Sequence, residues 1–134
     1  MQTIEREKRM NDAKRILKDA WDQHEGPIVL STADKHGVPN AIYATNVKML
    51  DDGRIVVADN YFNKTRTNIK NGSKGAVLFM TKEKKSYQAK GDIEYFTDGP
   101  IYEDMRQWVD QKHPRIAAAV LRVDELYSGA EKLI

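Results

Sequence analysis

The segment 59–68 (DNYFNKTRTN) holds the densest group of side chains that could bind an anion. It follows an apolar run and is predicted to open a short helix. The first turn of a helix presents unpaired backbone N–H groups and the positive end of the helix dipole. Lys64 and Arg66 would add positive charge, and Thr65 and Thr67 would add hydroxyl donors. The pattern therefore suits a phosphate monoester; the alternative is a capped surface helix with exposed charges.

Other catalytic patterns are absent from the sequence. His24, His36 and His113 are far apart and have no spacing typical of metal ligands. There is no cysteine, no G-x-S-x-G nucleophile motif and no glycine-rich phosphate loop. We therefore expect neither a metal site nor a hydrolase.

The composition is that of a globular protein, with 40% hydrophobic and 31% charged residues in a chain of 134. This length predicts a single domain, 1–134. The longest apolar run, 116–121, is far shorter than the roughly 18 residues of a membrane span. The charged N-terminus lacks the apolar core of a secretory signal. Together with the absence of cysteine, these features predict a cytoplasmic protein that does not bind membranes.

The charge is unevenly distributed. The net charge is only +2, yet the segment 64–90 contains eight basic residues and one acid. Such a block favours an anionic ligand nearby, although a solvated lysine-rich turn at 82–85 explains about half of it. A polyanion-binding module is an alternative, with aromatic residues as stacking platforms: Tyr61, Phe62, Phe79 and Tyr87. We expect core and pocket positions for these aromatics, because Phe79 lies in an apolar run, and we expect no nucleic-acid partner.

The elements that must position these groups follow from the periodicity. Apolar residues at helical spacing from Ala13 to Trp21 predict an N-terminal helix within 1–24, which ends before Gly26-Pro27. A short helix, 64–70, and an amphipathic helix around 101–109 come later. The predicted strands are 28–32, 40–50, 54–58, 75–81, 87–95 and 116–123. Their spacing and turns favour an antiparallel barrel over a parallel sheet, and residues 124–126 are predicted to open a closing stretch that is a short helix or turn.

The order of these stretches resembles a known family. An Ile/Val-rich strand, then Asn-Lys-Thr-x-x-Asn at 63–68, then the strand 76–79, is similar to the flavin-binding core of the pyridoxamine 5′-phosphate oxidase-like family. The likeness extends over about 26–123 and is greatest to the small homodimeric FMN-binding members. It implies an α+β fold, a six-stranded antiparallel split β-barrel with flanking helices. It also implies FMN bound at the interface of a homodimer.

The resemblance assigns residues to the cofactor. Lys64 and Thr65 would bind the FMN phosphate, with Asn68 as a further candidate. The backbone of the preceding strand would lie along the isoalloxazine ring, which implies Tyr43, Ala44, Thr45 and Asn46.

Further positions are implied around the flavin. Asp59 and Asn60 would approach the ribityl chain or the ring edge. Ser86 and Gln88 are two apart on one strand, hence on one face, and could reach the flavin from that side. Trp108 of the second subunit would cover the ring, and its alternative role is in the core.

The family resemblance also limits the function. The oxidases that act on pyridoxamine phosphate carry a C-terminal substrate-binding extension that has no counterpart here, so we do not expect that substrate. We predict an FMN-binding flavoprotein, an oxidoreductase if it is catalytic, with an unidentified substrate and small-molecule redox partner. The alternatives are a deazaflavin or haem in the same fold, or an FMN carrier without turnover.

Overall fold

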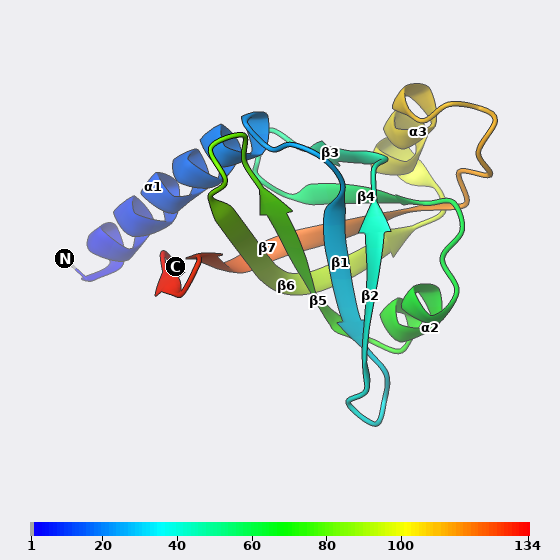
Figure 1. Cartoon of the computed structure of the whole chain (residues 1–134), viewed down its shortest axis with the longest axis horizontal. Helices are drawn as coiled ribbons and strands as arrows, with labels where there is room; N and C mark the ends of the chain where they lie inside the picture. The colour runs from blue at the N-terminus through cyan, green and yellow to red at the C-terminus, as the bar shows by residue number, and fades with distance from the viewer. Residues whose placement is uncertain (1) are drawn as a thin grey trace.

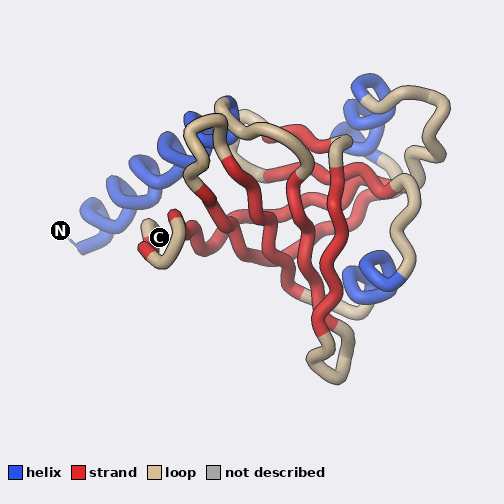
Figure 2. Tube along the Cα trace, viewed as in Figure 1, coloured by secondary structure: helices blue, strands red, loops and turns tan. Residues whose placement is uncertain are grey.

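The computed structural model describes residues 2–134 as a curled antiparallel sheet with three helices around it (Figures 1 and 2). The helices are α1 (Gln2–Asp22), α2 (Lys64–Lys70) and α3 (Gly99–Trp108). The strands are β1 (Ile28–Ala33), β2 (Pro39–Ala44), β3 (Val47–Met49), β4 (Ile55–Asp59), β5 (Lys74–Met80), β6 (Ser86–Phe96), β7 (Ala117–Ser128) and β8 (Glu131–Lys132).

The sheet order is β2-β1-β5-β6-β7-β4-β3, and β8 pairs with β7. The consecutive strands β2 and β3 therefore lie at the two opposite edges of the sheet. The chain passes between these edges at a tight turn in which the Val47 N–H donates to the Thr45 carbonyl, at 3.1 Å. The sheet curls into a half-barrel that stays unpaired between β2 and β3, which confirms the predicted α+β split barrel.

Two details differ from the sequence-based prediction. The predicted strand 40–50 is divided into β2 and β3 by the turn at Thr45, and with β8 the six predicted strands become eight. The closing stretch that 124–126 opens was predicted as a short helix or turn; its first residues instead continue β7 to Ser128, and a turn at 129–130 leads into β8. The long strand β6 supplies backbone partners for β7 from Ala118 to Ser128 except at Asp124, and Leu126 is buried.

A β-bulge bends the longest strand pair. Lys90 pairs with Glu125 and Gly91 with Val123, so Asp124 is an extra residue in β7. A Cβ atom on Gly91 would lie 1.7 Å from the carbonyl oxygen of Arg122. Only glycine allows the two backbones to approach this closely, so the curvature of the barrel depends on it.

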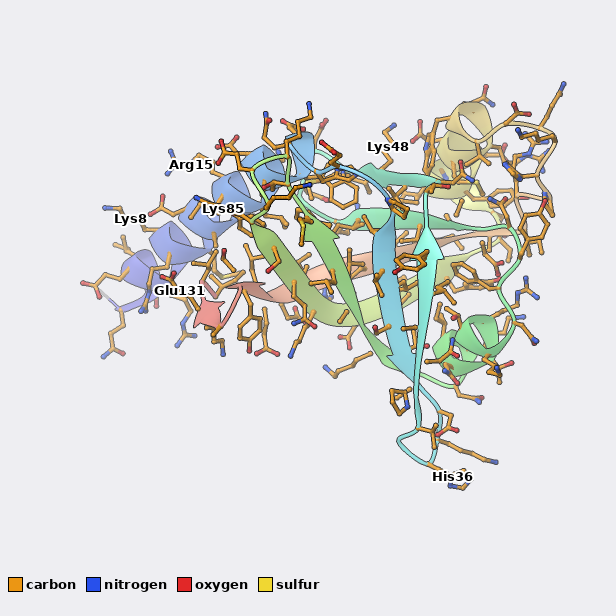
Figure 3. All side chains as sticks on the ribbon, in the orientation of Figure 1. Lys8, Arg15, His36, Lys48, Lys85 and Glu131 are labelled. Carbon is orange, nitrogen blue, oxygen red and sulfur yellow. The ribbon has the colours of Figure 1, made fainter. Side chains whose placement is uncertain are left out.

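The helices close the barrel from outside. The buried stripe of α1, from Ala13 to Trp21, packs on the main core formed by the inner faces of the strands, which confirms the predicted amphipathic helix. Met1 lies outside the described residues. The first half of α1 is exposed, with Lys8 projecting from it, and Arg15 projects from the second half (Figure 3). A second core forms where Met105 of α3 packs on β4 and β7. Among residues 2–134, no helix has both the length and the apolar character needed to cross a membrane.

Candidate functional site

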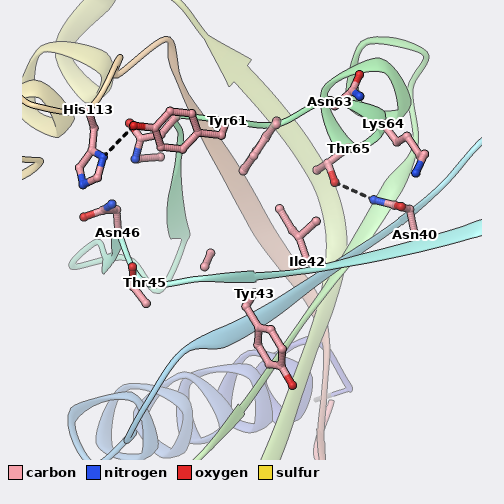
Figure 4. A pocket seen from close by; sticks show the side chains of 14 residues that line it. Asn40, Ile42, Tyr43, Thr45, Asn46, Tyr61, Asn63, Lys64, Thr65 and His113 are labelled. Carbon is pink, nitrogen blue, oxygen red and sulfur yellow. Dashed lines mark hydrogen bonds between the residues drawn. The ribbon is translucent and has the colours of Figure 1, made fainter.

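A cavity of about 410 Å³ lies between β2, the loop after β4 and the start of α2; we call it the inner cavity (Figure 4). Strand alternation shapes one wall, because Ile42 points toward α2 while the neighbouring Tyr43 ring points to the opposite side of β2. Its lining residues are Asn40, Ile42, Tyr43, Ala44, Thr45, Asn46, Ala58, Asn60, Tyr61, Phe62, Asn63, Lys64, Thr65 and His113.

One end of the inner cavity is rich in hydrogen-bond donors. Lys64 is exposed and forms no ion pair with any of residues 2–134. The Asn40 amide donates to the Thr65 hydroxyl at 3.0 Å, so the hydroxyl proton remains free to donate to another group. The side chain of Asn63 makes no capping bond to the helix that follows it. These side chains provide an ammonium, a hydroxyl and an amide for an anionic ligand.

The second cation of the predicted phosphate segment is already neutralised. Arg66 donates through Nε to Asp59 Oδ2 at 2.7 Å and through Nη2 to Asp59 Oδ1 at 2.8 Å. Asp59 is completely buried and also accepts bonds from the Tyr95 hydroxyl, at 2.5 Å, and the Phe62 N–H, at 3.0 Å. Neither Arg66 nor Asp59 lines the inner cavity. Among the residues that do, Lys64 is the only lysine, arginine, aspartate or glutamate.

The same network holds the loop after β4. The Asp59 carboxylate, at the end of β4, is bonded to Arg66 of α2 and Tyr95 of β6. These bonds fix the chain from Asn60 to Lys64. The hydrogen bonds that Arg66 donates to Asp59 raise the pKa of Arg66 above its usual value. Burial, reinforced by the hydrogen bond to Asp59, raises the pKa of Tyr95 to about 12. Both side chains thus keep their protons across the physiological range.

The other end of the inner cavity carries an imidazole and a phenol. The Tyr61 hydroxyl lies 3.3 Å from His113 Nδ1, and the two rings meet edge to face. Asn46 and His113 both line the cavity (Figure 4). The loop that carries His113 is attached to the site, because the Arg115 N–H donates to the Asn60 side chain at 3.0 Å.

The structure brings together seven of the twelve residues that the sequence analysis assigned to the cofactor. These are Tyr43, Ala44, Thr45, Asn46, Asn60, Lys64 and Thr65. The other five do not line the inner cavity.

Each of the remaining five has a different environment. Asp59 is in the buried ion pair, and the Asn68 amide donates to the Thr32 hydroxyl at 3.0 Å. Ser86 and Gln88 lie on β6, where they pair with Met80 and Leu78 of β5.

Trp108 ends α3, and its half-buried ring packs on the second core. Its indole N–H is buried without a hydrogen-bond partner among residues 2–134. In this chain its ring therefore lies away from the inner cavity.

The sequence analysis did not assign several lining residues. Asn40 and Ile42 share a face of β2 with Ala44, and this alternation could have identified them. His113 and Tyr61 come from loops, whose meeting no local pattern predicts. Within residues 2–134, no three His, Asp or Glu side chains are grouped so that they could hold a metal ion.

Comparison with known proteins identifies the family. Residues 17–127 match the family described as pyridoxamine 5′-phosphate oxidase. The chain belongs to this family. The chain is also 32% identical over 106 residues to an uncharacterized protein of Methanocaldococcus jannaschii, covering 75% of this chain and 71% of that protein.

Solved structures share the fold. An FMN-binding protein of Syntrophomonas wolfei superposes with a TM-score of 0.77 over 98% of both chains, at 18% identity. HupZ of Group A Streptococcus gives a TM-score of 0.72 at 25% identity, over 85% of this chain and 91% of HupZ. This member of the pyridoxamine 5′-phosphate oxidase family therefore has a fold that also occurs in a protein described as FMN-binding.

Proposed function

We propose that this protein is an FMN-dependent oxidoreductase that binds the cofactor in the inner cavity. Membership of the family and the fold shared with an FMN-binding protein support a flavin. The observation that carries the proposal is the unpaired Lys64 beside the Thr65 hydroxyl at one end of a cavity walled by β2.

The lining residues fit the parts of FMN. Lys64 contacts the phosphate as a point charge, and the Thr65 hydroxyl donates its free proton to a phosphate oxygen. The segment from Tyr43 to Asn46 forms the wall along the flavin ring, because its backbone lies where β2 ends at the sheet edge. Asn60 lies between these parts, within reach of the ribityl chain.

When bound, FMN supplies hydride and single-electron transfer, so the chain itself needs no catalytic nucleophile. The residues position the cofactor and exclude water along the β2 wall. Tyr61 and His113, at the end away from Lys64, provide groups that can hold or exchange a proton near a substrate.

We infer that two chains form a homodimer through the outer face of β1, β2 and β5. Val29 pairs with Tyr43 on one side and with Leu78 on the other, which forms an apolar row. Tyr43 is 79% exposed, Leu78 43% and Met80 45%. Such a row next to the cavity is typical of a surface that a partner covers.

The first experiment is the visible spectrum of the purified protein, followed by titration with FMN. We expect a flavin spectrum, and saturable quenching of FMN fluorescence by flavin-free protein. Lys64→Ala should weaken FMN binding by about 1.5–3 kcal/mol, the range for a charged hydrogen bond. Lys82→Ala is the matched control, because Lys82 is an exposed lysine of the same basic segment and lies outside the cavity. Equal affinities for the two variants would contradict the assigned phosphate contact.

A second experiment tests the dimer. Light scattering should give twice the chain mass for the wild type, and Leu78→Lys should shift it toward the monomer. Lys8→Ala, an exposed residue of α1 that is not on this face, should leave the mass unchanged. A monomeric wild type would overturn the proposed dimer and leave the flavin proposal to the binding experiment.

A further inference from the structure

A second hollow adjoins the inner cavity beyond Lys64. It has a volume of about 260 Å³ and lies between the β1–β2 turn and α2; we call it the outer cleft. Asn40, Asn63 and Lys64 line both hollows. The two therefore meet at the lysine that we assign to the phosphate, and the cleft also touches the start of β2 through Pro39 and Asn40.

The outer cleft presents a carboxylate and an apolar surface. Asp34 Oδ1 accepts the backbone N–H groups of His36, at 2.8 Å, and Val38, at 2.9 Å. Asp34 Oδ2 accepts no hydrogen bond from residues 2–134 and stays available to an external donor. Val38, at 58% exposure, and Pro39 form an apolar wall beside it.

These features distinguish between ligands that extend past the phosphate. A free carboxylate oxygen accepts hydrogen bonds from ribose hydroxyls, and an exposed apolar wall can pack against the face of a nucleobase. A polyacidic extension would instead meet the charge of Asp34, and Lys64 is the only lysine or arginine among the residues that line the cleft. The cleft thus suits a nucleoside better than an acidic tail.

We propose that the outer cleft is a nucleoside subsite and that the joined hollows bind a flavin dinucleotide, FAD. This inference rests on the proposed flavin site in the inner cavity. The isoalloxazine ring then lies along β2, the pyrophosphate passes Lys64, and the adenosine lies between the β1–β2 turn and α2. FMN occupies only the inner part of the same site.

The test compares FAD and FMN on flavin-free protein, with Asp34→Asn and Asp51→Asn as a matched pair. An asparagine at 34 keeps the acceptor for the turn N–H groups and removes the negative charge. Asp51, an exposed residue of the β3–β4 turn, loses the same charge away from both hollows. Wild-type protein should bind FAD at least as tightly as FMN. Relative to Asp51→Asn, Asp34→Asn should weaken FAD at least about fivefold and leave FMN within about twofold.

Several outcomes would overturn the subsite. FAD binding more than about tenfold weaker than FMN would overturn it and leave the flavin site standing. The subsite would also be overturned, with the flavin site standing, if Asp34→Asn lost equal affinity for FAD and for FMN. Tighter binding of the deazaflavin F420 than of FAD would have the same consequence. Failure of both flavins to bind would overturn the subsite and the proposed function together.

Discussion

Replacing Asp59 by asparagine tests whether its buried carboxylate holds the site together. The carboxylate accepts two hydrogen bonds from the Arg66 guanidinium, one from Tyr95 and one from a backbone N–H. Asparagine keeps one acceptor oxygen but loses the charge and the second acceptor. A hydrogen bond to a charged group contributes about 1.5–3 kcal/mol.

The size of the expected loss in unfolding free energy depends on how exposed Asp59 and Arg66 are. Asp59 has no exposed surface, whereas the Arg66 side chain is 28% exposed, so water solvates part of the unpaired guanidinium. Losing one of the paired charge-assisted bonds and weakening the other should then lower the free energy of unfolding by about 3 kcal/mol.

Urea unfolding followed by circular dichroism measures this loss, with both proteins at the same chain concentration. The matched control is Asp92→Asn, because Asp92 forms exposed ion pairs with Lys74 and Arg122. Exposed pairs contribute about 0–1 kcal/mol, so the control should barely change stability. If Asp59→Asn loses no more stability than Asp92→Asn, the network does not hold the loop as we describe.

Two further predictions concern the barrel. The raised pKa of Tyr95 means that the folded protein keeps a proton that the unfolded chain releases near pH 10; stability from this group is complete below pH 10 and is lost as the pH rises toward 12. Urea midpoints should therefore fall more steeply over that interval in the wild type than in Tyr95→Phe, and parallel curves would contradict the role of Tyr95. Gly91→Ala should destabilise the protein by about 3 kcal/mol, because its Cβ would collide with the Arg122 carbonyl. Thermal unfolding measures this, and an unchanged midpoint would show that the bulge tolerates a side chain.

Much of the fold could be predicted because its signals are local. The buried residues of α1 recur at helical spacing, and buried and half-buried residues alternate in β1. The end of α2 follows from Asn71-Gly72. The extension of β7 to Ser128 could not be predicted, because it depends on pairing with β6 rather than on its own residues. The break at Thr45 likewise depends on tertiary pairing, because β2 pairs with β1 at one edge of the sheet and β3 pairs with β4 at the other.

The candidate site shows the same division. Lys64 and Thr65 were predicted, because their order after an apolar strand resembles the family pattern. Arg66 is equally basic in sequence, and only the tertiary structure shows that a buried carboxylate neutralises it. His113 is brought to the cavity by a loop attached to Asn60, a contact across more than fifty residues that no spacing predicts.

The central claim is that the inner cavity binds FMN through a phosphate contact at Lys64. Its most direct test is a parallel fluorescence titration of flavin-free protein with FMN and with riboflavin, which lacks the phosphate. We predict saturable binding of one FMN per chain, at least about tenfold tighter than riboflavin, since the lost contact is a charge-assisted one. Equal affinities for the two flavins, or no saturable binding of either, would contradict the claim.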